Sequence, residues 1–216
     1  TPLAAIKGFI ETLDDPAAGD DAATRSRFLG IMATETNRMQ ALVRDLMSLS
    51  RIEAEKYDPP QTPVDFASII METVDHLRNS QKDRGADIAV DVTSDLPPVM
   101  GDVGQLRQLA SNILNNSMKY GHAGTPVSVS LTPSKSGAMI NFAVTDVGDG
   151  IAPEHLPRLT ERFYRVDSGR SRLVGGTGLG LSLVKHIVDR HRGHLEIRSI
   201  LSKGTTVSIL LPVAHS

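Results

Sequence analysis

The sequence has no cysteine, no long apolar run and no marked excess of charge of one sign. Without cysteine the chain can form neither a disulfide nor a thiolate metal site, which is compatible with a reducing compartment. A formal net charge of −2 gives no support for nucleic acid or an anionic membrane as a partner. The longest apolar runs, such as 209–211, are far shorter than the roughly 18 to 20 residues that span a bilayer. With no signal-peptide pattern at the start, we expect a soluble, cytoplasmic chain that does not contact the membrane.

Two helical stripes of apolar residues lie near the start of the chain. The first consists of Leu3, Ile6, Ile10 and Leu13. The second steps by three and four, as in a coiled-coil seam, through Phe28, Met32, Met39, Leu42, Leu46 and Leu49. Between them, DDPAAGDD at 14–21 combines Pro, Gly and clustered Asp, which favour a turn. The pattern predicts an antiparallel helical hairpin over residues 1–57.

The two predicted helices differ in length. At about 1.5 Å per residue, the helix at 22–55 spans roughly 50 Å and the helix at 1–13 about 20 Å. Much of the long stripe therefore has no partner within the hairpin. We expect a second copy of the chain to cover it, giving a homodimer, and the first helix to continue upstream of Thr1. A free-standing helix with an exposed apolar face is the alternative.

The chain changes character at YDPPQTP, residues 57–63, because its three prolines cannot continue a helix. We expect a short, stiff linker at 58–63. Beyond it the patterns predict helices at 66–84, 103–120 and 179–192, and strands at 87–93, 127–132, 139–146, 195–199 and 206–211. This order favours an α+β fold over 64–216, a sandwich with helices on one face of a mostly antiparallel sheet.

The predicted helix at 103–120 has an unusual polar face. Its amides and lysine recur at steps of three and four: Gln105, Gln108, Asn112, Asn116 and Lys119. Asparagine is a weaker helix former than alanine, by up to about 0.7 kcal/mol, so three asparagines in one helix call for a reason. Amide oxygens can ligate a hard cation such as Mg²⁺, and lysine can bind phosphate. An amide-rich surface helix is the alternative.

A carboxylate follows the apolar residues of the predicted strand at 139–146. Ile140, Phe142 and Val144 alternate with polar or small residues, so period two points Asp146 toward the core. A buried carboxylate requires a donor, and the exocyclic amine of adenine is one candidate. Gly148 and Gly150 follow, where a flat ring could approach the backbone. An aspartate that ends a strand before a turn is the alternative.

Four glycines precede the last predicted helix, in GGTGLGLSLVKHIV at 175–188. Unpaired backbone N–H groups at such a helix start can bind phosphate. The loop is not a Walker A loop, because the chain has no Gly-Lys dipeptide. The spacing of Gly176, Gly178 and Gly180 also differs from the dinucleotide-binding fingerprint.

The asparagine-bearing helix, the Asp-x-Gly-x-Gly turn at 146–150 and the glycine-rich loop follow one another along the chain. In this order they resemble the ATP-binding domain shared by gyrase, Hsp90, histidine kinases and MutL. ERFYRVD at 161–167 is similar to the aromatic box in the ATP lid of sensor histidine kinases. TPLAAIKGF at 1–9 is similar to the residues that follow the phosphoacceptor histidine in the dimerisation hairpin of these kinases. The resemblance covers nearly the whole chain, and it implies the cytoplasmic core of a sensor histidine kinase.

The resemblance implies a role for each motif residue. Asn116 would ligate Mg²⁺, with Asn112, Lys119 and Tyr120 around the metal and the phosphates of ATP. Asp146 would accept a hydrogen bond from the adenine amine, directly or through a water shared with Thr205. The base pocket would be floored by Gly148 and Gly150, and the lid would include Phe163 and Arg165. The phosphates would lie against the loop of Gly176, Thr177, Gly178, Leu179 and Gly180.

Asn112 separates two branches of this superfamily. Gyrase-type ATPases resemble one another in having a glutamate there, a general base that activates water. An amide cannot take that proton. We therefore expect phosphoryl transfer to another acceptor rather than hydrolysis, with Mg²⁺ and Lys119 neutralising charge and Asn112 at the catalytic site.

The family's acceptor histidine would lie four residues before Thr1. None of the seven histidines in the chain matches its motif, and we expect packing or surface roles for His155, His186 and His191. The chain should thus bind ATP without phosphorylating itself. In the intact protein, which an upstream segment could anchor in the inner membrane, we expect transfer to the histidine and then to an aspartate of a response-regulator receiver domain. Thr1 would help to position water for dephosphorylating that regulator.

Two other functions fit some of the same motifs. The chain could be an ATP-binding dimeric scaffold without kinase activity, or a hydrolytic ATPase of the gyrase or Hsp90 type, which Asn112 disfavours.

Overall fold

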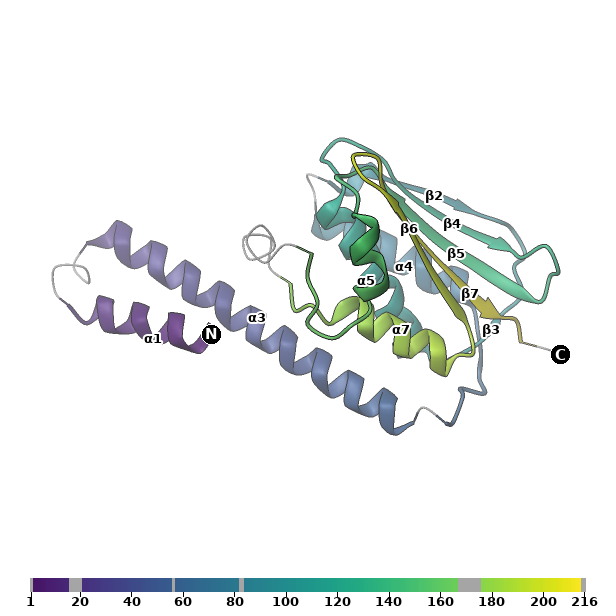
Figure 1. Ribbon diagram of the computed structural model, residues 1–216, viewed down its shortest axis with the longest axis horizontal. Helices are drawn as coiled ribbons and strands as arrows, with labels where there is room; N and C mark the ends of the chain where they lie inside the picture. The colour runs from purple at the N-terminus through teal and green to yellow at the C-terminus, as the bar shows by residue number, and fades with distance from the viewer. Residues whose placement is uncertain (1, 16–20, 56, 82–83, 167–175, 215–216) are drawn as a thin grey trace.

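A long helical hairpin projects from the rest of the molecule (Figure 1). The computed structural model describes residues 2–15, 21–55, 57–81, 84–166 and 176–214. Helix α1 spans Pro2–Leu13 and the antiparallel helix α3 spans Ala22–Ala54. Asp21 begins α3, because its carboxylate accepts hydrogen bonds from the N–H groups of Ala23 and Thr24. The short helix lies along only part of the long one, as the apolar stripes predicted.

Apolar side chains of this hairpin are exposed where neither helix covers the other. Leu3 and Ile10 of α1 are both more than half exposed, and so are Leu29, Val43 and Met47 of α3. Near its C-terminal end, by contrast, α3 buries Leu49 and Ile52 against the second part of the molecule. Leu29, Val43 and Met47 lie outside the predicted stripe, of which Leu46 is 44% exposed and Leu49 is buried. The other four stripe residues, Phe28, Met32, Met39 and Leu42, are half-buried.

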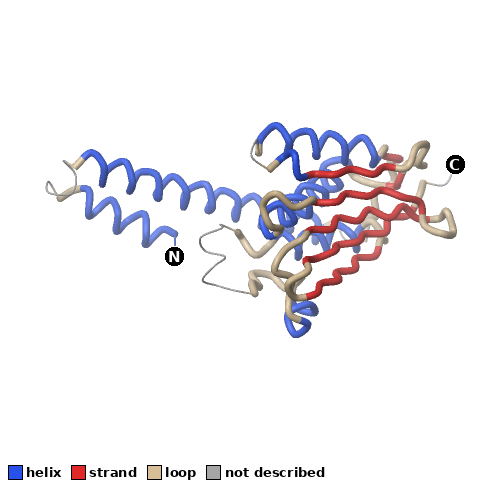
Figure 2. The backbone as a smooth tube through the Cα atoms, turned by 90° about the horizontal axis from the view of Figure 1, so that it is seen from above, coloured by secondary structure: helices blue, strands red, loops and turns tan. Residues whose placement is uncertain are grey.

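The second part is a five-stranded sheet with helices on one face (Figure 2). The strands lie in the order β2 (Ile88–Val92), β4 (Val127–Pro133), β5 (Met139–Asp146), β7 (Gly204–Pro212) and β6 (His194–Ile200). Only the β2–β4 pair is parallel, so the prediction of a mostly antiparallel sheet is confirmed. The covering helices are α4 (Phe66–Ser80), α5 (Val103–Tyr120) and α7 (Gly180–Arg190). Two short 3₁₀ helices, η1 (Gly85–Asp87) and η2 (Pro153–Arg158), connect these elements.

The core lies between the sheet and these helices. Along β5, Ile140, Phe142 and Val144 are at most 1% exposed, and the alternate residues face the other side. Phe66 of α4 meets Phe142 edge to face, with ring centroids 5.5 Å apart. The same period-two alternation points Asp146, the last residue of β5, into the interior.

Some element ends differ from the sequence-based expectations; α7, for example, spans 180–190 and not 179–192. Helix α4 ends at Ser80 and not at Arg84, and Arg84, beyond its end, donates to the backbone carbonyls of Met118, Gly121 and His122. The patterns also missed a two-residue pairing of β1 (Pro63–Val64) with β3 (Val99–Met100). Such short strands carry too few residues to show a period.

A buried histidine fixes α5 relative to α7. His191 follows α7 and is 2% exposed. Its Nε2 accepts a hydrogen bond from the N–H of Asp102, the residue that caps α5, and its Nδ1 lies 2.8 Å from the carbonyl oxygen of Ile187. Since a carbonyl only accepts, Nδ1 carries the proton and the ring is neutral. Burial lowers the pKa of His191, which favours the same form.

We expect this histidine to make folding sensitive to acid. Because the folded state disfavours the imidazolium, the unfolded chain binds more protons as the pH falls below about 6.5, and the free energy of unfolding decreases. A His191→Gln variant should lose about 1 kcal/mol at pH 8 and show a shallower decrease from pH 8 to pH 5. Urea unfolding across that range measures both, with the exposed His194→Gln as control. Equal slopes for His191→Gln and the unaltered chain would contradict the assignment.

Candidate functional site

Helix α5 presents the amide stripe that its sequence predicted. Asp102 begins the helix by accepting from the N–H of Gln105 at 2.9 Å. Asn112, Asn116 and Lys119 are half-buried on one face, whereas Asn115 between them is exposed. The Nδ2 of Asn112 donates to the carbonyl of its own helix at Gln108, at 2.9 Å, so its Oδ1 points away. The stripe therefore faces neighbouring elements and is not a solvated surface.

Asp146 lies at the end of β5 with its side chain in the interior. The residue is 6% exposed, and its Oδ1 accepts from the N–H of Thr205, its partner on β7, at 3.2 Å. The Ser117 hydroxyl of α5 also donates to the carboxylate. Burial raises the pKa of Asp146, while these two hydrogen bonds and the nearby His122 act in the opposite direction. Two of the roughly four acceptor positions of the carboxylate are thus used.

The glycines after β5 bring the backbone close to this carboxylate. A side chain at Gly148 would place its Cβ 2.5 Å from the carbonyl oxygen of Tyr120, so no other residue fits between β5 and the end of α5. Gly150 adopts φ 67° and lies against the backbone of Ile200. Gly148 therefore lies beside the Asp146 carboxylate, whereas Gly150 lies against the end of β6.

The glycine-rich loop lies against the amide stripe. A Cβ at Gly176 would be 2.7 Å from Nζ of Lys119, and one at Gly180 would be 2.9 Å from Oδ1 of Asn112. Thr177 stabilises the start of α7 by accepting from the N–H of Leu179 at 3.2 Å. Leu179 itself is buried. The loop and α5 therefore face each other across the site.

Two residues of the predicted lid contact this loop. Phe163 has φ 64°, a strained conformation for a bulky residue, and its N–H donates to the carbonyl of Gly178 at 2.9 Å. Gly178 has φ 72°, and a Cβ there would lie 3.0 Å from Cα of Phe163. Arg165 donates to the carbonyl of Gly176 at 3.1 Å. The described part of the lid is thus held to the glycine-rich loop.

The site is electrostatically positive at its loop end. Burial lowers the pKa of Lys119, and the charges of Arg165 and Arg38 lower it further. Burial raises the pKa of the Tyr120 hydroxyl, opposed by Arg165. A half-buried ammonium beside two guanidinium groups favours the binding of an anion, because the anion offsets the repulsion among the three positive charges.

Contacts link most of the predicted site residues: Lys119 and Asn112 lie against the glycine-rich loop, Phe163 and Arg165 bond to it, and Asp146 lies beside Gly148 and Thr205. Asn116 lies on the same face of α5 as Asn112, Gly150 lies against Ile200, and Thr1 lies outside the described residues. The described site residues come from α5, the end of β5, β7, the lid and the glycine-rich loop, which are distant in sequence. Sequence reasoning missed Ser117, Arg38 and Asp45. Asp45 gave a usable signal, because it stands three residues after Leu42 and four before Leu49 and so occupies an apolar stripe with a charge.

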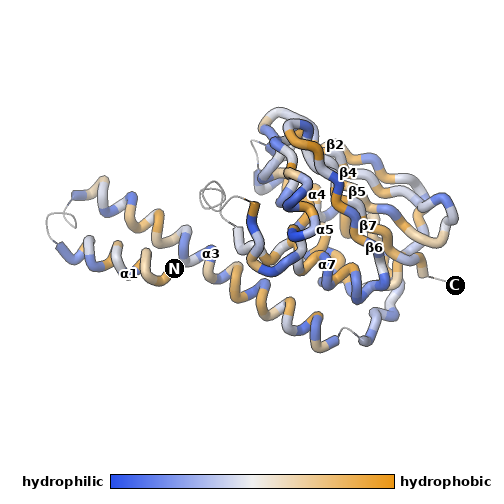
Figure 3. The backbone as a smooth tube through the Cα atoms, viewed as in Figure 1, coloured by the Kyte–Doolittle hydropathy of each residue, from blue (hydrophilic) through white to orange (hydrophobic). Residues whose placement is uncertain are grey.

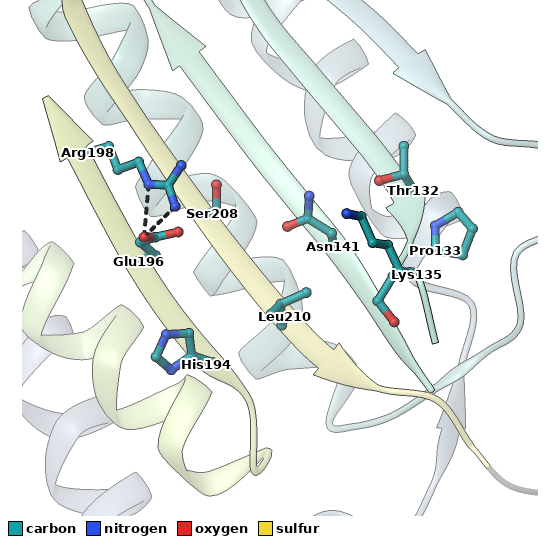
Figure 4. Close-up of a pocket in the computed structure, with 10 residues that line it drawn as sticks. Thr132, Pro133, Lys135, Asn141, His194, Glu196, Arg198, Ser208 and Leu210 are labelled. Carbon is teal, nitrogen blue, oxygen red and sulfur yellow. Dashed lines mark hydrogen bonds and ion pairs between the residues drawn. The ribbon is translucent and has the colours of Figure 1, made fainter. Parts of the chain in front are cut away.

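A hollow of about 400 Å³ lies elsewhere, on the face of the sheet opposite the helices (Figure 4). None of the predicted site residues lines it. Its walls include an Arg198–Glu196 ion pair at 2.8 Å and the side chains of His194, Lys135 and Asn141. Within the described ranges, no helix is long and apolar enough to cross a membrane, and no group of three His, Asp or Glu is placed to hold a metal ion.

Comparisons with known proteins agree with this geometry. Residues 101–215 match the family described as histidine kinase-, DNA gyrase B- and HSP90-like ATPase, and residues 1–55 match the His Kinase A (phospho-acceptor) domain. The structure of the mycobacterial sensor histidine kinase MprB is 30% identical, with a TM-score of 0.59, and covers 72% of this chain and 99% of its own. The chain belongs to the histidine kinase family. It is also 39% identical over 210 residues to the phosphate regulon sensor protein PhoR of Pseudomonas aeruginosa, covering 95% of this chain and 46% of PhoR.

The histidine kinase fold extends over both parts of the molecule. The histidine kinase AdeS of Acinetobacter baumannii matches all of this chain and 96% of its own, with a TM-score of 0.73 at 22% identity. The chain spans about half the length of the curated relatives it matches. The comparisons confirm the recognition of the family and the fold class, and the α-helical hairpin and ATPase-like domain correspond to the two matched regions.

The buried carboxylate of Asp146 should reduce the stability of the unliganded chain. Because folding raises the pKa of Asp146, the neutral carboxyl group contributes stability below the ordinary carboxyl pKa. This contribution is lost as the pH rises through the folded-state pKa. We expect Asp146→Asn to raise the free energy of unfolding at pH 7 by about 1 kcal/mol, and the gain to vanish toward pH 3. Urea unfolding at both pH values tests this, with the exposed Asp91→Asn on β2 as control. A variant that is less stable at pH 7 than the unaltered chain would refute it.

Proposed function

We propose that the chain binds MgATP between α5, the end of β5 and the glycine-rich loop. The buried carboxylate of Asp146 is the observation that carries this proposal. It keeps acceptor positions beyond those used by Thr205 and Ser117, which suits the exocyclic amine of a flat base. Thr205, paired with Asp146, would share a water between the carboxylate and the base.

The other end of the site suits the phosphates. Lys119 and the backbone of Gly176, Thr177 and Gly178 would bind them, with Phe163, Arg165 and Tyr120 closing over the nucleotide. Asn116 would hold Mg²⁺ through its amide oxygen, together with phosphate oxygens and water. When bound, the metal supplies positive charge to the phosphate oxygens. The absence of a carboxylate cluster among the described residues agrees with a metal that the nucleotide brings with it.

We further propose that the site favours phosphoryl transfer over hydrolysis. Asn112 has no basic atom that could take a proton from water, and its Oδ1 faces the start of α7. Positioning of the nucleotide and the charge of Lys119 would therefore provide most of the rate acceleration. A hydrolytic ATPase of the gyrase type would need a base at this position.

In the whole protein, we propose that the phosphoryl group passes to a histidine upstream of Thr1 and then to an aspartate on a response-regulator receiver domain. Thr1 would assist removal of phosphate from that regulator. This part would lie in the cytoplasm, with any anchor in the inner membrane supplied by other segments. The expected division into a hairpin at 1–57, a linker at 58–63 and an ATP-binding domain at 64–216 belongs to this proposal, although Pro63 pairs with Met100.

Replacement of Asn116 tests the kinase function. The whole protein, incubated with γ-labelled MgATP, should acquire acid-labile phosphate, and Asn116→Ala should reduce the initial rate at least about a hundredfold, because the metal loses its protein ligand. Asn115→Ala on the exposed face of the same helix is the matched control and should label normally.

Other results would select the alternatives. Binding of ATP by the whole protein without any labelling would indicate a dimeric scaffold, and rapid release of inorganic phosphate without an acceptor would indicate a hydrolytic ATPase. Labelling that persists in Asn116→Ala would exclude the metal assignment.

We propose that a second copy of the chain covers the exposed apolar side chains of the hairpin, which include Leu46 of the predicted stripe. The combined substitutions Leu29→Gln, Val43→Gln and Met47→Gln should weaken dimerisation by at least about a hundredfold, since burial of each such side chain contributes about 1.5 to 3 kcal/mol. Analytical ultracentrifugation measures the change. Ile200→Gln, at a similarly exposed apolar residue outside the hairpin, should leave the dimer intact. Equal weakening by both would contradict a dimer built on α3.

A further inference from the structure

Helix α3 of the hairpin lies directly against the glycine-rich loop. The Thr177 hydroxyl donates to Oδ2 of Asp45 at 2.8 Å. Further along α3, Glu53 forms an ion pair with Arg162, and Glu55 forms one with Arg190 of α7 at 2.9 Å. Figure 1 shows α3 and α7 running side by side. The hairpin therefore forms one wall beside the loop end of the proposed ATP site.

Arg38 occupies the same side of α3 as Asp45. Seven residues separate them, which is close to two full turns. The Arg38 side chain is only 25% exposed, and its ion pair is a long one, 3.8 Å to Glu35 one turn earlier. Its Nε is buried and makes no hydrogen bond to any residue in the described part of the chain. A buried guanidinium N–H without an acceptor is costly, so this group indicates a place for an anion.

Two cationic side chains lie beside Gly176, and a third, Arg38, approaches from α3. Arg165 of the lid donates to the carbonyl of Gly176, and Gly176 lies against Nζ of Lys119 on α5. Arg38 approaches Lys119 from the hairpin, closely enough for its charge to lower the pKa of that lysine. Like charges in a half-buried place repel one another, and a polyanion lying among them would reduce this repulsion.

We propose that Arg38 is a phosphate-binding residue contributed by the hairpin, so that the phosphates of a bound nucleoside triphosphate lie between α3 and the glycine-rich loop. This inference rests on the proposed MgATP site. Its consequence is that the phosphates link the hairpin to the ATP-binding domain. The adenine end of the ligand, held at Asp146, makes no such link.

Nucleotides of different phosphate content test the role of Arg38. In calorimetric titrations, Arg38→Gln should weaken MgATP binding about tenfold and leave adenosine binding unchanged, because a charge-assisted hydrogen bond is lost only at the phosphates. Arg38→Lys should restore part of the affinity. The matched control is Arg27→Gln, an exposed arginine of the same helix, which should bind both ligands normally. If Arg38→Gln melts below the assay temperature, Arg38→Met, which keeps the aliphatic length, replaces it.

The outcomes separate this inference from the function on which it rests. Unchanged MgATP affinity in Arg38→Gln, beside normal binding by the unaltered chain, overturns the role of Arg38 alone. Equal losses for MgATP and adenosine overturn it as well, since they indicate a general structural effect. An unaltered chain that binds neither ligand overturns the ATP site and the inference together.

Discussion

The buried carboxylate of Asp146 is the constraint on which the rest of the site depends. An ionisable group at the end of a core strand is unfavourable unless donors surround it, and two of these come from β7 and α5. To bring those donors within reach, the chain uses a close backbone approach at Gly148 and a β5–β7 register that pairs Asp146 with Thr205. The carboxylate thus lies where β5, β7 and α5 meet, at one end of the amide stripe.

Much of the fold follows from local patterns. The alternation along β5 and the apolar stripe of α5 predicted both elements with their observed ends, since each buries one face against a single neighbour. The same alternation placed Asp146 in the interior. The order of the three motifs and their resemblance to the histidine kinases supplied the roles, which periodicity alone left open.

Long-range contacts escaped prediction. Arg84, beyond the end of α4, bonds to carbonyls more than 30 residues away, and the β1–β3 pairing joins segments of two residues. Neither leaves a period in the sequence. Arg38 and Asp45 were missed for a related reason: they belong to a helix whose pattern predicts a coiled coil. The Thr177 hydroxyl that donates to Asp45, and the Lys119 ammonium whose pKa the charge of Arg38 lowers, lie far along the chain.

The β6 edge of the sheet and the helical hairpin differ in the surface that they offer to another chain. Strand β6 lies at one end of the strand order, with backbone groups on one side not paired within the described sheet. It carries His194, Glu196 and Arg198 at alternate exposed positions, and charged residues on an edge strand oppose edge-to-edge pairing and aggregation. The hairpin lacks such protection and exposes aliphatic side chains instead. Self-association is therefore discouraged at this edge of the sheet, and the proposed association through the helices would leave the proposed nucleotide site accessible.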